Sequence, residues 1–194
     1  MNPSISDPTS KTLLFDTYKT AFRTYFDDET VSRQVLEAVE ITRQAGRLIF
    51  IGNGGSNAIC SHMMEDFIKV ARIPAVSFTD AALITCFAND YGYPHAILEW
   101  LKVIYRPGDT LYAISSSGKS PNILHATEFI KAQGERVITL TGFAPGNPLS
   151  QMGDVNFCIP VQSYGIVECF HQTLVHIILD TIAHTSVQTS AQTI

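Results

Sequence analysis

The chain has 194 residues, a length that suits one globular domain with a sizeable core. Its net charge of −5 argues against a general nucleic-acid-binding surface, and no apolar run reaches the roughly 18 residues that span a membrane. The first eleven residues are polar and lack the apolar segment of a secretory signal. We therefore expect a cytoplasmic protein without nucleic-acid or membrane partners.

The chain is expected to open with a helical hairpin over residues 12–46. Tyr18, Phe22 and Phe26 recur every four residues and mark one face of its first helix. A second helix is expected from Thr30, which can cap its start, to about residue 45.

From residue 47 onward, short apolar strands alternate with helices. The expected strands are residues 47–52, 74–78, 109–114, 136–140 and 155–159. The expected helices are residues 57–71, 81–89, 94–104, 121–133 and 165–184, with tails at 1–10 and 185–194. This alternation predicts an α/β fold in which helices cover both faces of one parallel sheet, in a single domain. Such sheets bind ligands at the carboxyl ends of their strands.

A serine-rich loop follows the third strand and leads directly into a helix. It holds Ser115, Ser116, Ser117 and Ser120 around Gly118. Serine hydroxyls and the free amide protons of a helix N-terminus suit a phosphate monoester, and glycine allows the backbone to approach the anion. An ordinary helix cap with exposed serines is the alternative that this pattern leaves open.

A second loop of small residues, Asn53-Gly54-Gly55-Ser56, has the same strand-to-helix context. Ser56 can cap its helix and also reach the same ligand. The loop lacks the G-x-G-x-x-G spacing of a dinucleotide site, and the Walker A pattern is missing, so no nucleotide cofactor is expected. Two such loops favour phosphate binding more strongly than either loop alone.

These loops lie in stretches that resemble the SIS (sugar isomerase) domain family, and within it the phosphoheptose isomerases. The stretches run in the family's order over residues 12–184: IGNGGSNAICSHMMEDF, ITCFANDYGY, ISSSGKSPNIL, VITLTGF and IVECFHQTLVHIILD. The resemblance implies a three-layer sandwich with a five-stranded parallel sheet. It also implies a homotetramer with active sites at subunit interfaces.

The resemblance also implies roles for individual residues. In the family, phosphate lies in the loop that matches Ser115, Ser117 and Ser120, with help at Ser56. Asn53 and Asp90 match positions near the sugar, and Glu168 is also expected to bind the substrate.

The acid/base pair that the resemblance implies is Asp66 and His176, on two different helices. An aldose–ketose isomerase moves a proton between neighbouring carbons through an enediol, and a carboxylate and an imidazole can divide that work. His62 lies four residues before Asp66 and shares its helix face, while Glu168 and His176 share a stripe two turns long. Two imidazoles and two carboxylates suit tetrahedral Zn²⁺, which some members of the family hold here.

The residues themselves leave other readings open. His62 and Asp66 can form a surface ion pair, and His176 can be a core histidine on an apolar helix. Glu168 can act on the helix dipole alone, and His171 is an alternative catalytic histidine.

Several positions depart from the family pattern. Asp66 is one methylene shorter than the family's Glu, and Glu168 replaces its usual Gln. Val70 stands where the family has a basic residue, and Gly165 where it has Asp. These departures leave the phosphosugar reading intact but weaken the assignment of sedoheptulose 7-phosphate as substrate.

Two functions follow. The first is isomerisation of sedoheptulose 7-phosphate or a related ketose phosphate, feeding surface-polysaccharide (lipopolysaccharide) precursors. The second is a non-catalytic SIS module that binds a phosphosugar or a protein partner, as a replication-initiation regulator of similar sequence does. That regulator class lacks the histidine of the last helix, so the presence of His176 favours the enzyme.

Overall fold

Five parallel strands form a single sheet in the spatial order β2-β1-β3-β4-β5. The structure is a computed structural model that describes residues 8–191, with side chains described from residue 14 to residue 185. The strands are β1 (Arg47–Ile51), β2 (Ala75–Ser77), β3 (Asp109–Ser115), β4 (Arg136–Gly142) and β5 (Val155–Ile159). The helices are α1 (Pro8–Phe26), α2 (Glu29–Gln44), α3 (Gly55–Asp66), α4 (Ala81–Tyr91), α5 (Tyr93–Ile104), α6 (Pro121–Ala132) and α7 (Tyr164–Ala191), with a π-helical turn η1 (Phe67–Ala71) and a 3₁₀ turn η2 (Leu149–Gln151).

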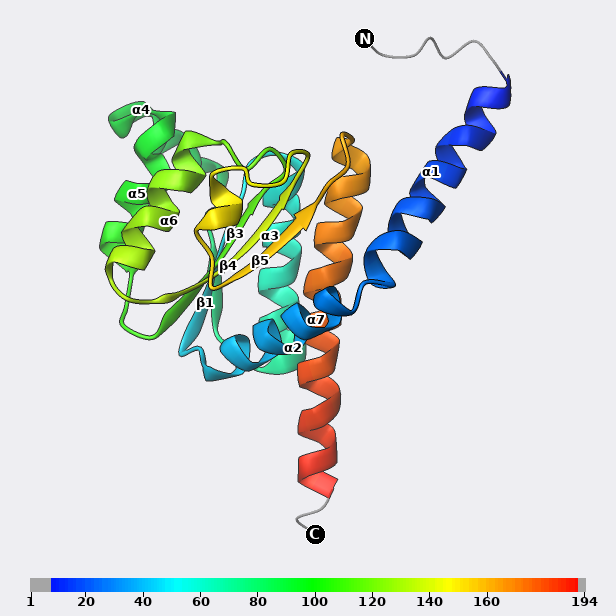
Figure 1. The fold of residues 1–194 in the computed structure, drawn as a ribbon. Helices are drawn as coiled ribbons and strands as arrows, with labels where there is room; N and C mark the ends of the chain where they lie inside the picture. The colour runs from blue at the N-terminus through cyan, green and yellow to red at the C-terminus, as the bar shows by residue number, and fades with distance from the viewer. Residues whose placement is uncertain (1–7, 192–194) are drawn as a thin grey trace.

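Helices cover both faces of the sheet, as Figure 1 shows, with α4, α5 and α6 on one face and α2, α3 and α7 on the other. Side chains alternate between these faces along each strand. Leu48 and Phe50 of β1 join the core beneath α3 and α7, whereas Ile49 and Ile51 join the core beneath α5 and α6. The expected three-layer α/β sandwich around a five-stranded parallel sheet is confirmed.

The strand order creates a switch point between β1 and β3. The chain leaves β1 through α3 toward β2 on one side, and leaves β3 through α6 toward β4 on the other. Open parallel sheets bind ligands in the crevice that opens where the connections diverge in this way. The two small-residue loops predicted to bind phosphate lie at this point.

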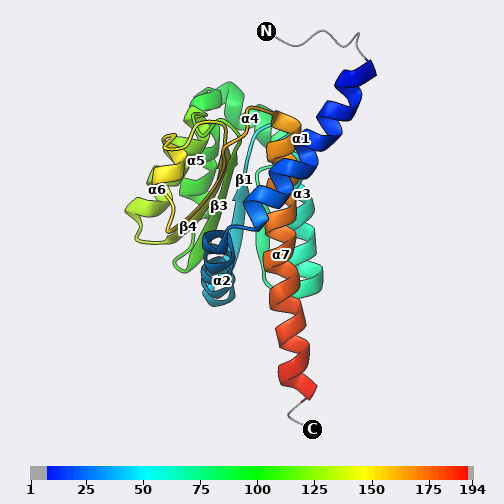
Figure 2. The ribbon, with the colours of Figure 1, turned by 45° about the vertical axis from the view of Figure 1, so that its right-hand side comes forward.

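The two opening helices are present, and α1 makes its main aromatic contacts with α7. The rings of Phe22 and Phe170 stack with their centroids 4.1 Å apart, and Phe26 stacks on the same ring at 5.6 Å. In Figures 1 and 2 the amino-terminal half of α1 projects beyond the sandwich. Leu14 and Phe15 on this projecting part are 59% and 71% exposed.

Both terminal helices are longer than the sequence predicts. Helix α1 already begins at Pro8, and α7 continues past His184 to Ala191. Proline is well tolerated in a first helical turn, and residues 166–191 contain no glycine or proline that would end α7. Residues 1–7 and 192–194 of the expected tails lie outside the described residues.

Helix α7 is more apolar than expected from the absence of a long apolar run in the sequence. Within the described part of the chain, Tyr164–Thr185 is the one helix whose length and composition would let it cross a membrane. Half of its apolar window is buried inside the fold, where Phe170, Leu174 and Ile178 are fully covered. Its apolar face therefore serves as part of the core.

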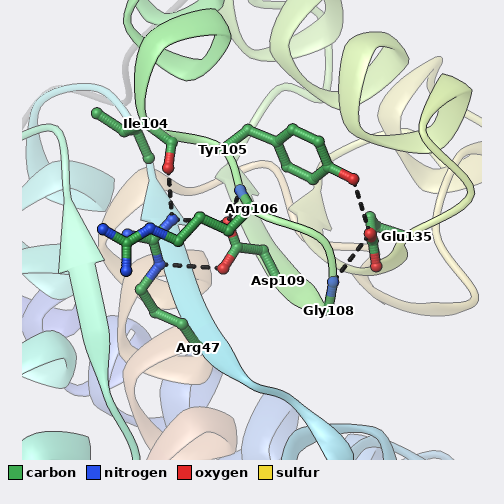
Figure 3. A network of polar contacts seen from close by, with 7 residues as sticks. All are labelled: Arg47, Ile104, Tyr105, Arg106, Gly108, Asp109 and Glu135. Carbon is green, nitrogen blue, oxygen red and sulfur yellow. Dashed lines mark hydrogen bonds and ion pairs between the residues drawn. The ribbon is translucent and has the colours of Figure 1, made fainter.

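A polar network joins the amino-terminal ends of β1 and β3, at the edge of the sheet away from the switch point (Figure 3). Arg47 donates two hydrogen bonds to the carboxylate of Asp109, at 3.0 and 2.7 Å, and a third to the carbonyl oxygen of Ile104. The Asp109 carboxylate also accepts from the backbone N–H of Arg106. The Asp109 side chain is only 2% exposed.

Replacing Asp109 by alanine is expected to lower the free energy of unfolding by about 3 kcal/mol, because Arg47 then keeps a largely buried, unpaired charge. Urea unfolding measures the loss. The control is Asp27→Ala, which removes the exposed i,i+4 ion pair with Arg23 and should cost less than about 1 kcal/mol. Equal losses in the two variants would contradict this account.

Candidate functional site

A polar cleft of about 170 Å³ opens at the switch point, above the carboxyl ends of β1 and β3. The N-termini of α3 and α6 both point into this region, so their free amide protons and positive dipole ends favour an anion. The lining residues come from both predicted loops and from the first turns of α7. They are Asn53, Ser56, Ser115, Ser116, Ser117, Ser120, Tyr164 and Glu168.

The serine loop presents hydroxyls that are not all used within the protein. The Ser115 hydroxyl donates to Ser120 Oγ at 3.2 Å, and Ser117 Oγ accepts from the backbone N–H of Lys119. Ser116 is 5% exposed, and its hydroxyl has no hydrogen-bond partner in the described structure. A buried hydroxyl without a partner is unfavourable, so a ligand oxygen or a water in this cleft would complete it.

The path of this loop depends on Gly118. Its φ of +62° is a left-handed conformation that residues with a side chain rarely adopt. A Cβ atom at this position would lie 1.7 Å from Asn147 Oδ1. Asn147 cannot readily move, because it is buried and bonded to the carbonyl oxygens of Gly142 and Ala144 and to the backbone N–H of Ser150.

The loop after β1 is tied to the serine loop by a pair of side-chain amides. Asn53 and Asn122 exchange two hydrogen bonds, of 3.0 and 2.9 Å, and the hydroxyl of Tyr93 donates to Asn53 Oδ1 at 2.8 Å. Asn122 is 3% exposed and lies in the first turn of α6. The pair therefore holds the ends of β1 and β3 in one arrangement. Sequence reasoning missed Asn122 and Tyr93, since only the fold brings them to Asn53.

Glu168 reaches the cleft from the second turn of α7. Its carboxylate lies against the first residue of α3, where a Cβ atom on Gly55 would be 2.4–2.5 Å from both carboxylate oxygens. Glycine at position 55 thus makes room for this carboxylate. Tyr164, also missed by the sequence analysis, lines the same cleft and packs edge-to-face on Phe143.

Helices α3 and α7 run alongside each other beyond the cleft. Gln172 contacts Met63, and one turn farther the rings of His62 and His176 lie 5.3 Å apart. Asp66 closes this group, with Oδ2 3.4 Å from His62 Nε2. It is the last residue of α3, directly before the π-helical turn, a feature that often marks functional sites.

The structure therefore gathers three of the four predicted metal ligands. One nitrogen or oxygen atom each of His62, Asp66 and His176 lies within 4.8 Å of the others. Glu168 is not in this group, because eight residues of helix separate it from His176 by about 12 Å along the axis. The sequence pattern indicated the shared stripe of α7 but not this separation.

The chemistry of these three side chains, and the spacing of one pair, are those of a zinc site. Ligand atoms about 2.1 Å from a tetrahedral ion lie about 3.4 Å from one another, the distance observed between His62 and Asp66. Two imidazoles and one carboxylate are also a donor set found in catalytic zinc sites, where a fourth position stays open. His62 is half exposed, which leaves that side of the group accessible.

Asp90 is not among the residues that line the cleft. It lies on the exposed side of α4, where its carboxylate accepts from the side-chain amide of Asn89. Its predicted role in sugar binding stays a prediction.

The alternative histidine, His171, belongs to the core. It is fully buried, and its Nε2 donates to the carbonyl oxygen of Thr141 at 3.0 Å. Burial lowers its pKa from 6.5 to about 4, so the ring is neutral near pH 7. Because it is neutral, fully buried and bonded to β4, His171 has a structural role.

This shift predicts a pH dependence of stability. Because the pKa of His171 is depressed in the folded state, its contribution is present above pH 6.5 and is lost as the pH falls toward 4. The expected loss is about 3 kcal/mol, measured by urea unfolding at several pH values. His171→Gln, which can keep the bond to Thr141, should flatten the curve in this window. An unchanged slope in that variant would contradict the assignment.

Comparisons with known proteins show which family the chain belongs to. Residues 22–142 match the SIS domain family, which is more than half of the chain. The chain belongs to the SIS domain family. A phosphoheptose isomerase from Fusobacterium nucleatum is 33% identical to this SIS protein over 181 residues, covering 87% of this chain and 93% of the relative. One from Serratia proteamaculans is 31% identical, covering 79% and 82%.

Solved structures extend the comparison to the fold. The phosphoheptose isomerase of Neisseria gonorrhoeae superimposes on this SIS protein with a TM-score of 0.81 at 26% identity, covering 90% of this chain and 98% of that one. The Francisella tularensis enzyme has the same fold, with a TM-score of 0.84 at 24% identity over 93% and 100%. This SIS protein is an isomerase of the phosphosugar class.

Proposed function

We propose that this SIS protein interconverts sedoheptulose 7-phosphate, or a closely related ketose phosphate, and the matching aldose phosphate. The observation that carries the proposal is the serine-lined cleft at the switch point, with two helix N-termini and the unpartnered hydroxyl of Ser116. These groups suit the phosphate of the substrate. The relatives named phosphoheptose isomerase support the seven-carbon sugar.

Asp66 and His176 are proposed to transfer the protons. Isomerisation removes a proton from the carbon next to the carbonyl and returns it to the former carbonyl carbon, through an enediol. Asp66 is the proposed base for this carbon-bound proton, and His176 moves the proton between the two oxygens. The His62 imidazole, 3.4 Å from Asp66, holds that carboxylate in place.

The same side chains are the proposed ligands of a zinc ion. His62, Asp66 and His176 would hold it, and the ion would supply Lewis-acid polarisation of the substrate oxygens when bound. A carboxylate bound to zinc is a poor base. Asp66 would therefore act as a metal ligand in the zinc-bound protein and as the base in the metal-free protein.

We also propose a homotetramer in the cytoplasm, acting in the synthesis of surface polysaccharide precursors. The exposed apolar side chains of Leu14 and Phe15 on the projecting part of α1 support self-association. Native mass measurement tests the assembly, and a monomer at micromolar concentration would contradict it.

Turnover of sedoheptulose 7-phosphate tests the function. The aldose product is followed with purified protein, with and without chelator, and after zinc is added back. Product formation is expected in the untreated sample. A folded protein that converts neither this sugar nor other ketose phosphates would overturn the proposal. Activity that survives complete metal removal assigns direct proton transfer to Asp66, whereas loss restored by zinc assigns Asp66 the role of a metal ligand.

A further inference from the structure

Glu168 introduces a negative charge into a cleft that otherwise suits an anion. Among the described residues that line the cleft it is the only charged one, and the others are serines, Asn53 and Tyr164. No lysine or arginine in this lining offsets its charge. Its carboxylate lies against Gly55, at the N-terminus of α3, where an anionic ligand would also gain from the helix dipole.

The carboxylate is also free to bind something. Among the described residues it forms no hydrogen bond or ion pair with the rest of the chain, and Glu168 is only partly buried. A carboxylate accepts hydrogen bonds from hydroxyl groups, and such charge-assisted bonds are roughly twice as strong as neutral ones. The same group repels a phosphate or sulfate dianion held a few ångströms away.

These opposite effects distinguish two kinds of ligand. We infer that Glu168 is a specificity-determining residue that rejects bare inorganic anions and accepts phosphate esters whose hydroxyl groups can bond to its carboxylate. Inorganic phosphate is repelled by the Glu168 carboxylate and gains nothing in return. A polyhydroxylated sugar phosphate is also repelled, but its hydroxyl groups donate compensating hydrogen bonds to the same carboxylate. The inference deepens the proposed function and rests on the cleft being the phosphate site.

The test measures binding without turnover. Dissociation constants are determined by calorimetry for sulfate, for phosphate and for glucitol 6-phosphate, a polyol phosphate that has hydroxyls but no carbonyl to isomerise. Sulfate keeps its charge at every working pH, which separates charge repulsion from ligand titration. The variants are Glu168→Gln, which removes the charge with little change in shape, and Glu128→Gln, which makes the same change on the exposed face of α6.

In Glu168→Gln, sulfate and phosphate are expected to bind about tenfold more tightly, because one like charge is removed from the cleft. Glucitol 6-phosphate is expected to gain nothing or to bind more weakly, since it also loses its bonds to the carboxylate. Glu128→Gln should leave all three constants unchanged. A tighter complex cannot result from damage to the fold, so this outcome is specific to the role proposed here.

Three results would overturn the inference. Bare anions that bind Glu168→Gln no more tightly than the parent chain would show that the carboxylate does not exclude them. An equal gain for glucitol 6-phosphate would show that the hydroxyls do not use it. In both cases the parent chain still binds glucitol 6-phosphate, and the proposed function stands. If neither chain binds any of the three ligands, the cleft is not a phosphate site and both proposals fail.

Discussion

Replacing Asp66 by asparagine is expected to lower kcat by about 10²–10⁴-fold, the usual contribution of one positioned proton-transfer group. The KM should change little, because Asp66 lies beyond the cleft that holds the phosphate. The steady-state rate of aldose formation measures both constants. His176→Gln should act in the same direction, since the two side chains belong to one group.

The matched control is Glu65→Gln, an exposed neighbour of Asp66 on the same helix. It makes the same chemical change beside the site and should leave kcat within about twofold of the parent value. The double variant of Asp66 and His176 should lose less than the product of the single losses, because groups that act as a unit are not additive. An Asp66→Asn protein that is folded and fully active would refute the assignment.

Gly118→Ala is expected to abolish phosphate binding and to lower the free energy of unfolding by more than about 4 kcal/mol. The left-handed φ of +62° alone costs a residue with a side chain about 1–2 kcal/mol. The new methyl group would also force Asn147 away, and each of its broken buried hydrogen bonds costs about 1–3 kcal/mol. Urea unfolding and calorimetry with glucitol 6-phosphate measure the two losses.

Gly134 offers a close control for this substitution. It follows α6 with a φ of +80°, but a Cβ atom there would meet nothing within 4 Å. Gly134→Ala should therefore cost only the backbone term of about 1–2 kcal/mol and leave phosphate binding intact. Similar losses in the two variants would show that the contact with Asn147 does not decide the path of the serine loop.

The phosphate cleft was largely predictable from local sequence. Ser115–Ser120 follow an apolar strand and open a helix, and so do Asn53–Ser56. In a parallel sheet the carboxyl ends of neighbouring strands meet at one edge, so the two loops had to lie close together if β1 and β3 were neighbours. Local sequence does not specify that adjacency, whereas the resemblance to the SIS family implies it.

Features that depend on packing between distant helices were less predictable. The packing of α3 against α7 brings His62 next to His176, which lies 114 positions later in the sequence. The periodicity within each helix does not indicate how far one helix is shifted along the other. For the same reason Glu168 was assigned to the metal group although it lies about two turns away. The roles of Asp66, His176 and Asp90 stay predictions.

The reciprocal amides of Asn53 and Asn122 have a consequence for how such a chain evolves. Each asparagine bonds both polar ends of the other, so a change at position 53 leaves the buried amide of Asn122 without a partner. A substitution at one of these positions therefore favours a compensating substitution at the other. We expect the two positions to covary among homologues.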